Sequence, residues 1–194
     1  MQNVRWNSRV SVLPSSNRTP TDSERGTQLV VRAPDDLTSA PVSAVVAPEE
    51  QDAPWKHPEW QRLWLATQRA EWRSLALVPA GAMPPRFTLE IALALAYTGS
   101  LHLGEPIRMA DATSVPLTHL KQFVAELEAL RRAGDRLVVA LGPVRDSATA
   151  VALAQSADQA LLCVPLEVSK VADAKRTIAE VGARRFLGSA VFRV

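Results

Sequence analysis

The fold of this 194-residue chain is decided by the stretch Leu75-Ala76-Leu77-Val78-Pro79-Ala80-Gly81-Ala82-Met83-Pro84-Pro85-Arg86-Phe87-Thr88. Its first four residues form an apolar run with the length of a buried β-strand. A proline-containing loop follows, and apolar residues then recur from Leu89 to Ala96, which predicts a helix. A strand joined to a helix by a short loop is the repeating unit of parallel α/β sheets.

This loop stands where a nucleotide-binding chain carries its phosphate loop, but its chemistry differs. A phosphate loop needs glycines that let backbone N–H groups face phosphate, followed by Lys and Ser or Thr. Here Gly81 is the single glycine, and two prolines without an N–H follow it. Arg86 and Thr88 stand near the Lys and Ser/Thr positions; they could bind an anion or simply lie at an exposed helix start. We therefore expect a nucleotide-binding fold that has lost its catalysis and holds no cofactor, with ATP and Mg²⁺ retained only in the less favoured alternative.

The rest of the chain repeats the strand-then-helix pattern. The predicted strands are 75–78, 106–110, 136–141, 159–164 and 186–192. The predicted helices are 87–98, ended by Gly99 as a C-cap, then 116–133, 147–156 and 169–181. This alternation predicts a three-layer α/β sandwich, with a mainly parallel central sheet flanked by helices. Ligands of such sheets bind beyond the carboxyl ends of the strands.

Two of those strand ends bear on catalysis. Asp111 follows the second predicted strand, where it could hold magnesium or form a turn before the next helix, and the turn is the commoner role. Ala140 and Leu141 end the third predicted strand, where an ATPase would place a magnesium-binding Asp. Neither side chain can coordinate a metal. The loss at this strand agrees with the loss in the loop, and together they indicate a non-catalytic protein.

The N-terminal part differs in composition from the rest. Residues 1–54 hold 6 of the 14 prolines, and five Arg against seven acids, so their net charge is −2 and that of residues 55–194 is +4. Such a segment buries too little apolar surface to offset its ordering entropy, so we predict a mostly disordered tail. The folded domain is predicted to span 55–194. Two apolar islands, 28–32 and 41–46, are either incidental or dock on a partner or on the domain.

An aromatic helix is predicted to open the domain at Pro58. Trp60 and Trp64 share one face of it with two further residues at helical spacing. This face could pack on the helix's own domain, or it could form a contact with a neighbouring subunit together with Glu59 and Arg62. The sequence leaves both interpretations open.

Composition and spacing exclude several other classes of function. The net charge of +2 gives no bulk argument for nucleic acid, and the basic clusters are interleaved with acids, as on a solvated face. The histidines His57, His102 and His119 lack metal-ligand spacing, and Cys163 lies alone in an apolar run. No secretory signal and no run of about 20 apolar residues is present, so we expect a cytoplasmic protein without a direct membrane span.

With these elements in order, residues 59–194 resemble the SIMIBI-class P-loop proteins of the ParA/MinD group. Within that class the chain is most similar to the cytoplasmic domain of bacterial tyrosine kinases of the capsular and exopolysaccharide co-polymerase family. The strongest stretch runs from Asp135 through Gly142-Pro143 to Ala157-Asp158 and Val164. Asp111 falls where that family's second Walker motif places an Asp, and Glu59-x-x-Arg62 resembles the start of its ring-forming helix motif.

The departures from the family give the functional expectation. The third position of the helix motif is Leu65 instead of Arg, and Tyr97 is the only tyrosine, so the family's C-terminal tyrosine cluster is missing. The resemblance then implies a kinase-like accessory protein without kinase activity, which binds protein partners in an envelope-associated assembly or forms a homo-oligomer. A divergent ATP-binding switch using Gly81, Arg86, Thr88 and Asp111, or a ParA/MinD-like positioning protein, is the alternative. Nucleic acid is not expected as a partner.

Overall fold

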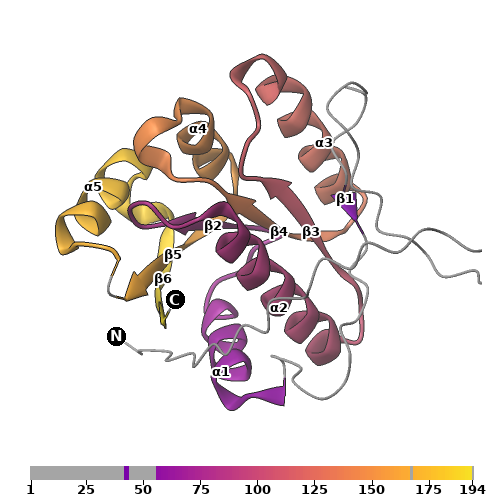
Figure 1. The fold of residues 1–194 in the computed structure, drawn as a ribbon. Coiled ribbons are helices and arrows are strands. Elements are labelled where there is room, and N and C mark those ends of the chain that lie inside the picture. The colour runs from indigo at the N-terminus through magenta and orange to yellow at the C-terminus, as the bar shows by residue number, and fades with distance from the viewer. Residues whose placement is uncertain (1–41, 44–55, 167, 194) are drawn as a thin grey trace, which may run out of the picture.

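The computed structural model describes residues 42–43, 56–166 and 168–193, and these form one sheet with helices on both faces (Figure 1). The six strands lie in the order β1-β3-β4-β2-β5-β6. Their bounds are β1 Val42–Ser43, β2 Ser74–Pro79, β3 Ile107–Ala112, β4 Arg136–Leu141, β5 Gln159–Leu166 and β6 Phe186–Arg193. The helices are α1 Pro58–Thr67, α2 Pro85–Leu103, α3 Leu120–Arg132, α4 Ala148–Ser156 and α5 Val171–Val181.

The sheet confirms the predicted architecture. Strands β3, β4, β2, β5 and β6 run parallel to one another, and among the described strands β1 alone is antiparallel, on the outer edge of β3. Every residue of the central strand β2 is buried, as expected for a strand covered by helices on both faces. The chain is therefore a three-layer α/β sandwich of the kind found in P-loop NTPases.

One face of the sheet is covered by α1 and α2. Trp60 and Trp64 of α1 are 2% and 1% exposed, and they pack in one core with Ile91 and Leu95 of α2 and with Phe192 of β6. The rings of Trp60 and Phe192 lie 6.0 Å apart between centroids. The opposite face is covered by α3, α4 and α5, whose buried residues Phe123, Leu127, Ala150, Leu153 and Val181 form a second core.

Helix α2 is longer than the sequence predicted, and the assignment of Gly99 as its C-cap was wrong. The helix continues to Leu103 and ends at Gly104, which has the left-handed φ of 71° typical of a helix terminus. Gly99 is buried inside the helix instead. A Cβ atom there would lie 2.5 Å from ring atoms of Trp64, and it would also clash with the side chain of Ile107. Gly99 is thus needed for the close approach of α2 to α1 and β3.

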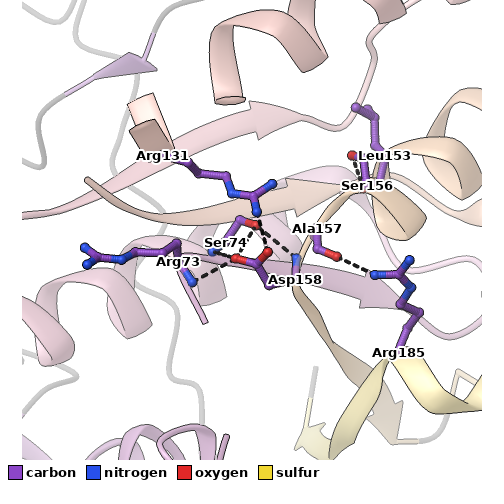
Figure 2. A network of polar contacts seen from close by, with 8 residues as sticks. All are labelled: Arg73, Ser74, Arg131, Leu153, Ser156, Ala157, Asp158 and Arg185. Atoms are coloured by element: carbon purple, nitrogen blue, oxygen red, sulfur yellow. Dashed lines mark hydrogen bonds and ion pairs between the residues drawn. The ribbon is translucent and has the colours of Figure 1, made fainter. Parts of the chain in front are cut away.

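A polar network closes the amino-terminal edge of the sheet (Figure 2). The Asp158 carboxylate accepts hydrogen bonds from the backbone N–H groups of Arg73 and Ser74, at 2.8 and 2.9 Å, and from the Ser74 hydroxyl at 3.1 Å. The same carboxylate pairs with the guanidinium of Arg131 on α3. Asp158 therefore joins the start of β2, the start of β5 and the end of α3.

The predicted tail lies outside the described residues, apart from Val42–Ser43. These two residues belong to the island 41–46, and they pair with Ala110 and Met109 of β3. The island 28–32 lies outside the described residues. Part of the island 41–46 therefore docks on the domain itself, at the edge of the sheet.

Candidate functional site

The candidate site is the loop between β2 and α2, at the carboxyl end of the central strand. Its first residue, Ala80, donates its N–H to the carbonyl of Cys163 on β5 at 2.8 Å. The Ala80 carbonyl in turn accepts a hydrogen bond from the hydroxyl of Ser169. Gly81 has a φ of 74°, a conformation that favours glycine. The loop is thus tied to β5 and to the segment that follows β5.

The space directly against Gly81 is filled by Ser169, just before α5, and by Asp173 in the first turn of α5. A Cβ atom added at Gly81 would lie 3.2 Å from Ser169 Oγ and 3.4 Å from the nearest carboxylate oxygen of Asp173. This carboxylate also accepts a hydrogen bond from the Lys170 N–H at 3.1 Å. A phosphate loop presents N–H groups and positive charge to its ligand. Here the side of Gly81 on which a Cβ would stand meets a carboxylate, which would repel an anion brought close to it.

Thr88 is placed unlike a magnesium ligand. Its side chain is completely buried, and its hydroxyl faces the sulfur of Met83 at 3.5 Å. Met83 is itself 1% exposed and belongs to the core between the sheet and α2. The Thr88 hydroxyl therefore faces a thioether in the core, and the loop before it carries prolines, so this helix start lacks the polar groups that a metal would need.

Arg86 lies in the exposed first turn of α2, with its guanidinium 4.9 Å from the centre of the Phe87 ring. The next carboxyl along the helix, Glu90, is half-buried, and one of its oxygens is buried with no hydrogen-bond partner in the described part of the chain. Desolvation by burial raises the pKa of Glu90, and the nearby charge of Arg86 partly opposes this rise. Arg86 thus interacts with two residues of its own helix, the Phe87 ring and the Glu90 carboxyl.

Asp111 forms a turn at the end of β3. One of its carboxylate oxygens accepts hydrogen bonds from the Thr113 N–H at 2.9 Å and from the Thr113 hydroxyl at 2.7 Å. In the sheet register Asp111 lies beside Ala140, and Ala140 lies beside Leu77, so β4 separates Asp111 from the loop strand. Gly142, just after β4, lets this turn approach, because a Cβ atom there would clash with the Thr113 carbonyl.

The structure therefore does not bring the four predicted nucleotide-site residues into one site. Gly81 is half-buried against Ser169 and Asp173, Thr88 is in the core, Arg86 is on the surface of α2, and Asp111 is one strand away in a turn. Sequence reasoning missed Ser169 and Asp173, which fill the space against the loop. A signal was available, since the segment that enters a helix after β5 must lie at the same sheet edge as the loop after β2.

The predicted contact helix α1 is only partly available for partners. Trp60 and Trp64 are buried against the protein's own sheet and α2, which corrects the interpretation that places them on a neighbouring subunit. The face was ambiguous because aromatic residues suit a core and an interface equally. Arg62 is exposed and Glu59 is half-buried, so both remain at the surface.

An exposed apolar patch lies beside α1 instead. Leu65 on α1 is 54% exposed and Leu101 on α2 is 58% exposed. The two leucines line one shallow pocket together with Gln61, Thr98 and His102. Large apolar side chains gathered at the surface are typical of protein contact sites.

Cys163 carries no chemistry in its present position. The side chain is completely buried in β5, and burial raises the pKa of its thiol to about 12. Among residues 56–166 and 168–193, no group of three acidic, histidine or cysteine side chains could hold a metal ion. Within the same ranges no helix has the length and hydropathy needed to cross a bilayer.

Comparison with known proteins gives a structural match only. No protein-family model and no curated protein matches the chain. Among solved structures, the chimerical protein CapA2B2 matches with a TM-score of 0.53, over 79% of this chain and 95% of that chain, at 11% sequence identity. An identity this low shows a shared fold, and the match agrees with the P-loop-like sandwich described above.

Proposed function

We propose that this protein is a non-catalytic, kinase-like accessory protein of the cytoplasm. It acts through contacts with other proteins, in polysaccharide synthesis or export or in another envelope-associated assembly. The observation that carries the proposal is the loop after β2, in which Gly81 lies against Ser169 and the carboxylate of Asp173 instead of against positively charged groups. The kinase-like part rests on the sequence resemblance, and the shared fold with CapA2B2 supports the architecture that it requires.

The remaining parts of a nucleotide site support the same proposal. Thr88 has its hydroxyl in the core, Asp111 uses its carboxylate in a turn, and Ala140 has nothing with which to bind magnesium. Phosphoryl transfer depends on charge stabilisation by a lysine and by metal ions at the transferred group. A fold that keeps its sheet and helices while losing these groups is suited to binding other proteins.

The surface proposed for partner contact is the patch formed by Leu65 and Leu101. Both leucines are more than half exposed and lie next to Trp64, which is buried below them. A partner that covers this patch would bury apolar area at about 25 cal/mol per Å². The exposed Arg62 lies on the same helix and would add charge at the rim of the contact.

Calorimetric titration of the full chain with ATP and ADP, each with magnesium, tests the proposal. We expect no binding up to millimolar nucleotide. Binding in the micromolar range that Asp173→Ala strengthens would show that the loop is a partly blocked site, and it would overturn the proposal. The matched control is Asp52→Ala, which removes the same charge from the N-terminal segment.

A second candidate is a divergent ATP-binding switch, in which Arg86 replaces the lysine and Asp111 holds the metal. It is favoured by the exposure of both side chains at the carboxyl-terminal edge of the sheet. The same titration separates the two candidates, because the switch predicts magnesium-dependent binding that is lost in Arg86→Ala and in Asp111→Ala.

A further inference from the structure

A groove lies between α1 and the outer edge of the sheet. It has a volume of about 610 Å³, and β6, β5 and the residues around the end of α5 form its other walls. Its lining is mostly apolar, including Leu63, Phe186 and Leu187, and it contains Arg62 and Arg69 but no acid. Both arginines are exposed. The groove therefore suits an extended segment that is apolar and carries negative charge.

One wall of this groove is an edge strand. Among the described strands, β6 pairs with β5 alone, so the backbone groups of its outer side have no strand beside them. Gly188 and Ser189 are exposed there, and a Cβ atom at Gly188 would meet nothing within 4 Å. Such an edge is a template for one more strand. The other edge differs, because β1 already covers β3.

We propose that residues 29–36 of a second copy of this chain add a strand to β6 and occupy this groove. The segment begins with Leu29-Val30-Val31, which suit a strand in contact with apolar walls. Pro34 has no N–H to donate and ends the pairing. Asp35 and Asp36 follow, and with Arg32 inside the segment they give it a net charge of −1, opposite in sign to Arg62 and Arg69 of the groove.

Chain length assigns the segment to a second copy. Val42 pairs with β3 at one edge of the sheet, and Val31 precedes it by eleven residues, which span at most about 40 Å. The straight line from β1 to a strand beyond β6 crosses six strand spacings, about 29 Å. A path around a layer of helices, each about 10 Å thick, adds about 20 Å. On this estimate the eleven residues fall about 10 Å short of β6 of the same chain while β1 stays paired, which favours a second copy, and reciprocal exchange between two copies gives a closed dimer.

The mass of the full chain in solution, measured by light scattering, tests this inference. We expect the wild type to have twice the monomer mass of 21.1 kDa. Val30→Pro, which removes a donor from the added strand, should give the monomer mass. Val10→Pro makes the same change elsewhere in the N-terminal segment and should leave the dimer intact. A dimer that persists in Val30→Pro, or a wild type that stays monomeric up to about 100 µM, would overturn the inference.

Charge exchange provides a sharper experiment. We expect Asp35→Arg/Asp36→Arg to be monomeric alone, and Arg62→Glu/Arg69→Glu to be monomeric alone, both with unchanged circular dichroism. Mixing the two should restore the dimer, because each segment then meets a groove of opposite charge on the other copy. If the mixture stays monomeric, exchange between copies is excluded. The inference is independent of nucleotide binding, so the mass measurement and the calorimetric titration can fail separately.

Discussion

Replacement of Asp158, at the amino-terminal edge of the sheet, should destabilise the domain more than replacement of most other partly exposed residues. Its carboxylate accepts two backbone N–H groups of β2 and the Ser74 hydroxyl, and pairs with Arg131. Replacement by alanine leaves the two N–H groups without this acceptor. The Asp158 side chain is 26% exposed, so water can replace part of what is lost. We take about 1 kcal/mol for each of the three hydrogen bonds and less for the ion pair.

The free energy of unfolding of Asp158→Ala should therefore fall by about 3 kcal/mol, a large part of the 5–15 kcal/mol typical of a domain. Urea unfolding followed by tryptophan fluorescence measures it, because Trp60, Trp64 and Trp72 are all buried and report on the core. Asp158→Asn keeps an acceptor oxygen and should lose about half as much. The urea dependence should be the same in all variants.

The matched control is Asp135→Ala. Asp135 pairs with Arg108 at 2.8 Å, and both side chains are partly exposed, at 24% and 39%, so this ion pair has a similar exposure to the Asp158–Arg131 pair. Its loss should cost about 0.5 kcal/mol. If Asp158→Ala and Asp135→Ala destabilise the protein equally, the assigned role of the Asp158 network is refuted.

Three further predictions concern the interior. Gly99→Ala should lower the free energy of unfolding by about 1–2 kcal/mol, because the clash with Trp64 outweighs the gain in helix propensity. The control Gly188→Ala should change the free energy of unfolding by less than about 0.5 kcal/mol, since a Cβ atom there meets nothing within 4 Å. Urea unfolding compares the two variants. Cys163 should resist alkylation at pH 8 until the protein unfolds, since burial raises its pKa to about 12; fast labelling of the folded protein would contradict this. The raised pKa of Glu90 means that the folded state binds the carboxyl proton more tightly than the unfolded state does. The free energy of unfolding should therefore fall as the pH rises from the ordinary pKa of Glu through the raised pKa of the folded state. Glu90→Gln should remove this decline, which urea unfolding from pH 4 to 7 measures.

The sequence was sufficient for the architecture because its strands are short apolar runs and its helices follow them in regular order. Every predicted strand of residues 75–192 is present, and the strand 136–141 has the predicted bounds. Gly99 was misassigned because the sequence does not distinguish a glycine that ends a helix from a glycine that makes room for a tryptophan. The ring that makes Gly99 necessary comes from α1, 35 residues earlier.

The candidate site was less predictable for a physical reason. The presence of a single glycine and the absence of a lysine in the loop and of an Asp on the third strand can be read from the chain, but the groups that fill the space against the loop cannot. Ser169 and Asp173 lie more than 80 residues after Gly81, and only the parallel pairing of β2 with β5 brings them to the loop. The burial of Trp60 and Trp64 was unpredictable for a similar reason, because the core in which they pack is built from strands that come later in the chain.

The strand order has a consequence for how the chain reaches its native state. The central strand β2 is flanked by β4 and β5, which follow it by about 60 and 85 residues, and the Asp158 contacts with Arg73 and Ser74 span 85 and 84 residues. Closing such long loops costs entropy before any contact offsets it, so folding should be slow for a domain of this size. A chain emerging from the ribosome holds β2 without either neighbour until more than half of the domain has been made. We therefore expect the first half of the domain to expose apolar strand residues to chaperones during its synthesis.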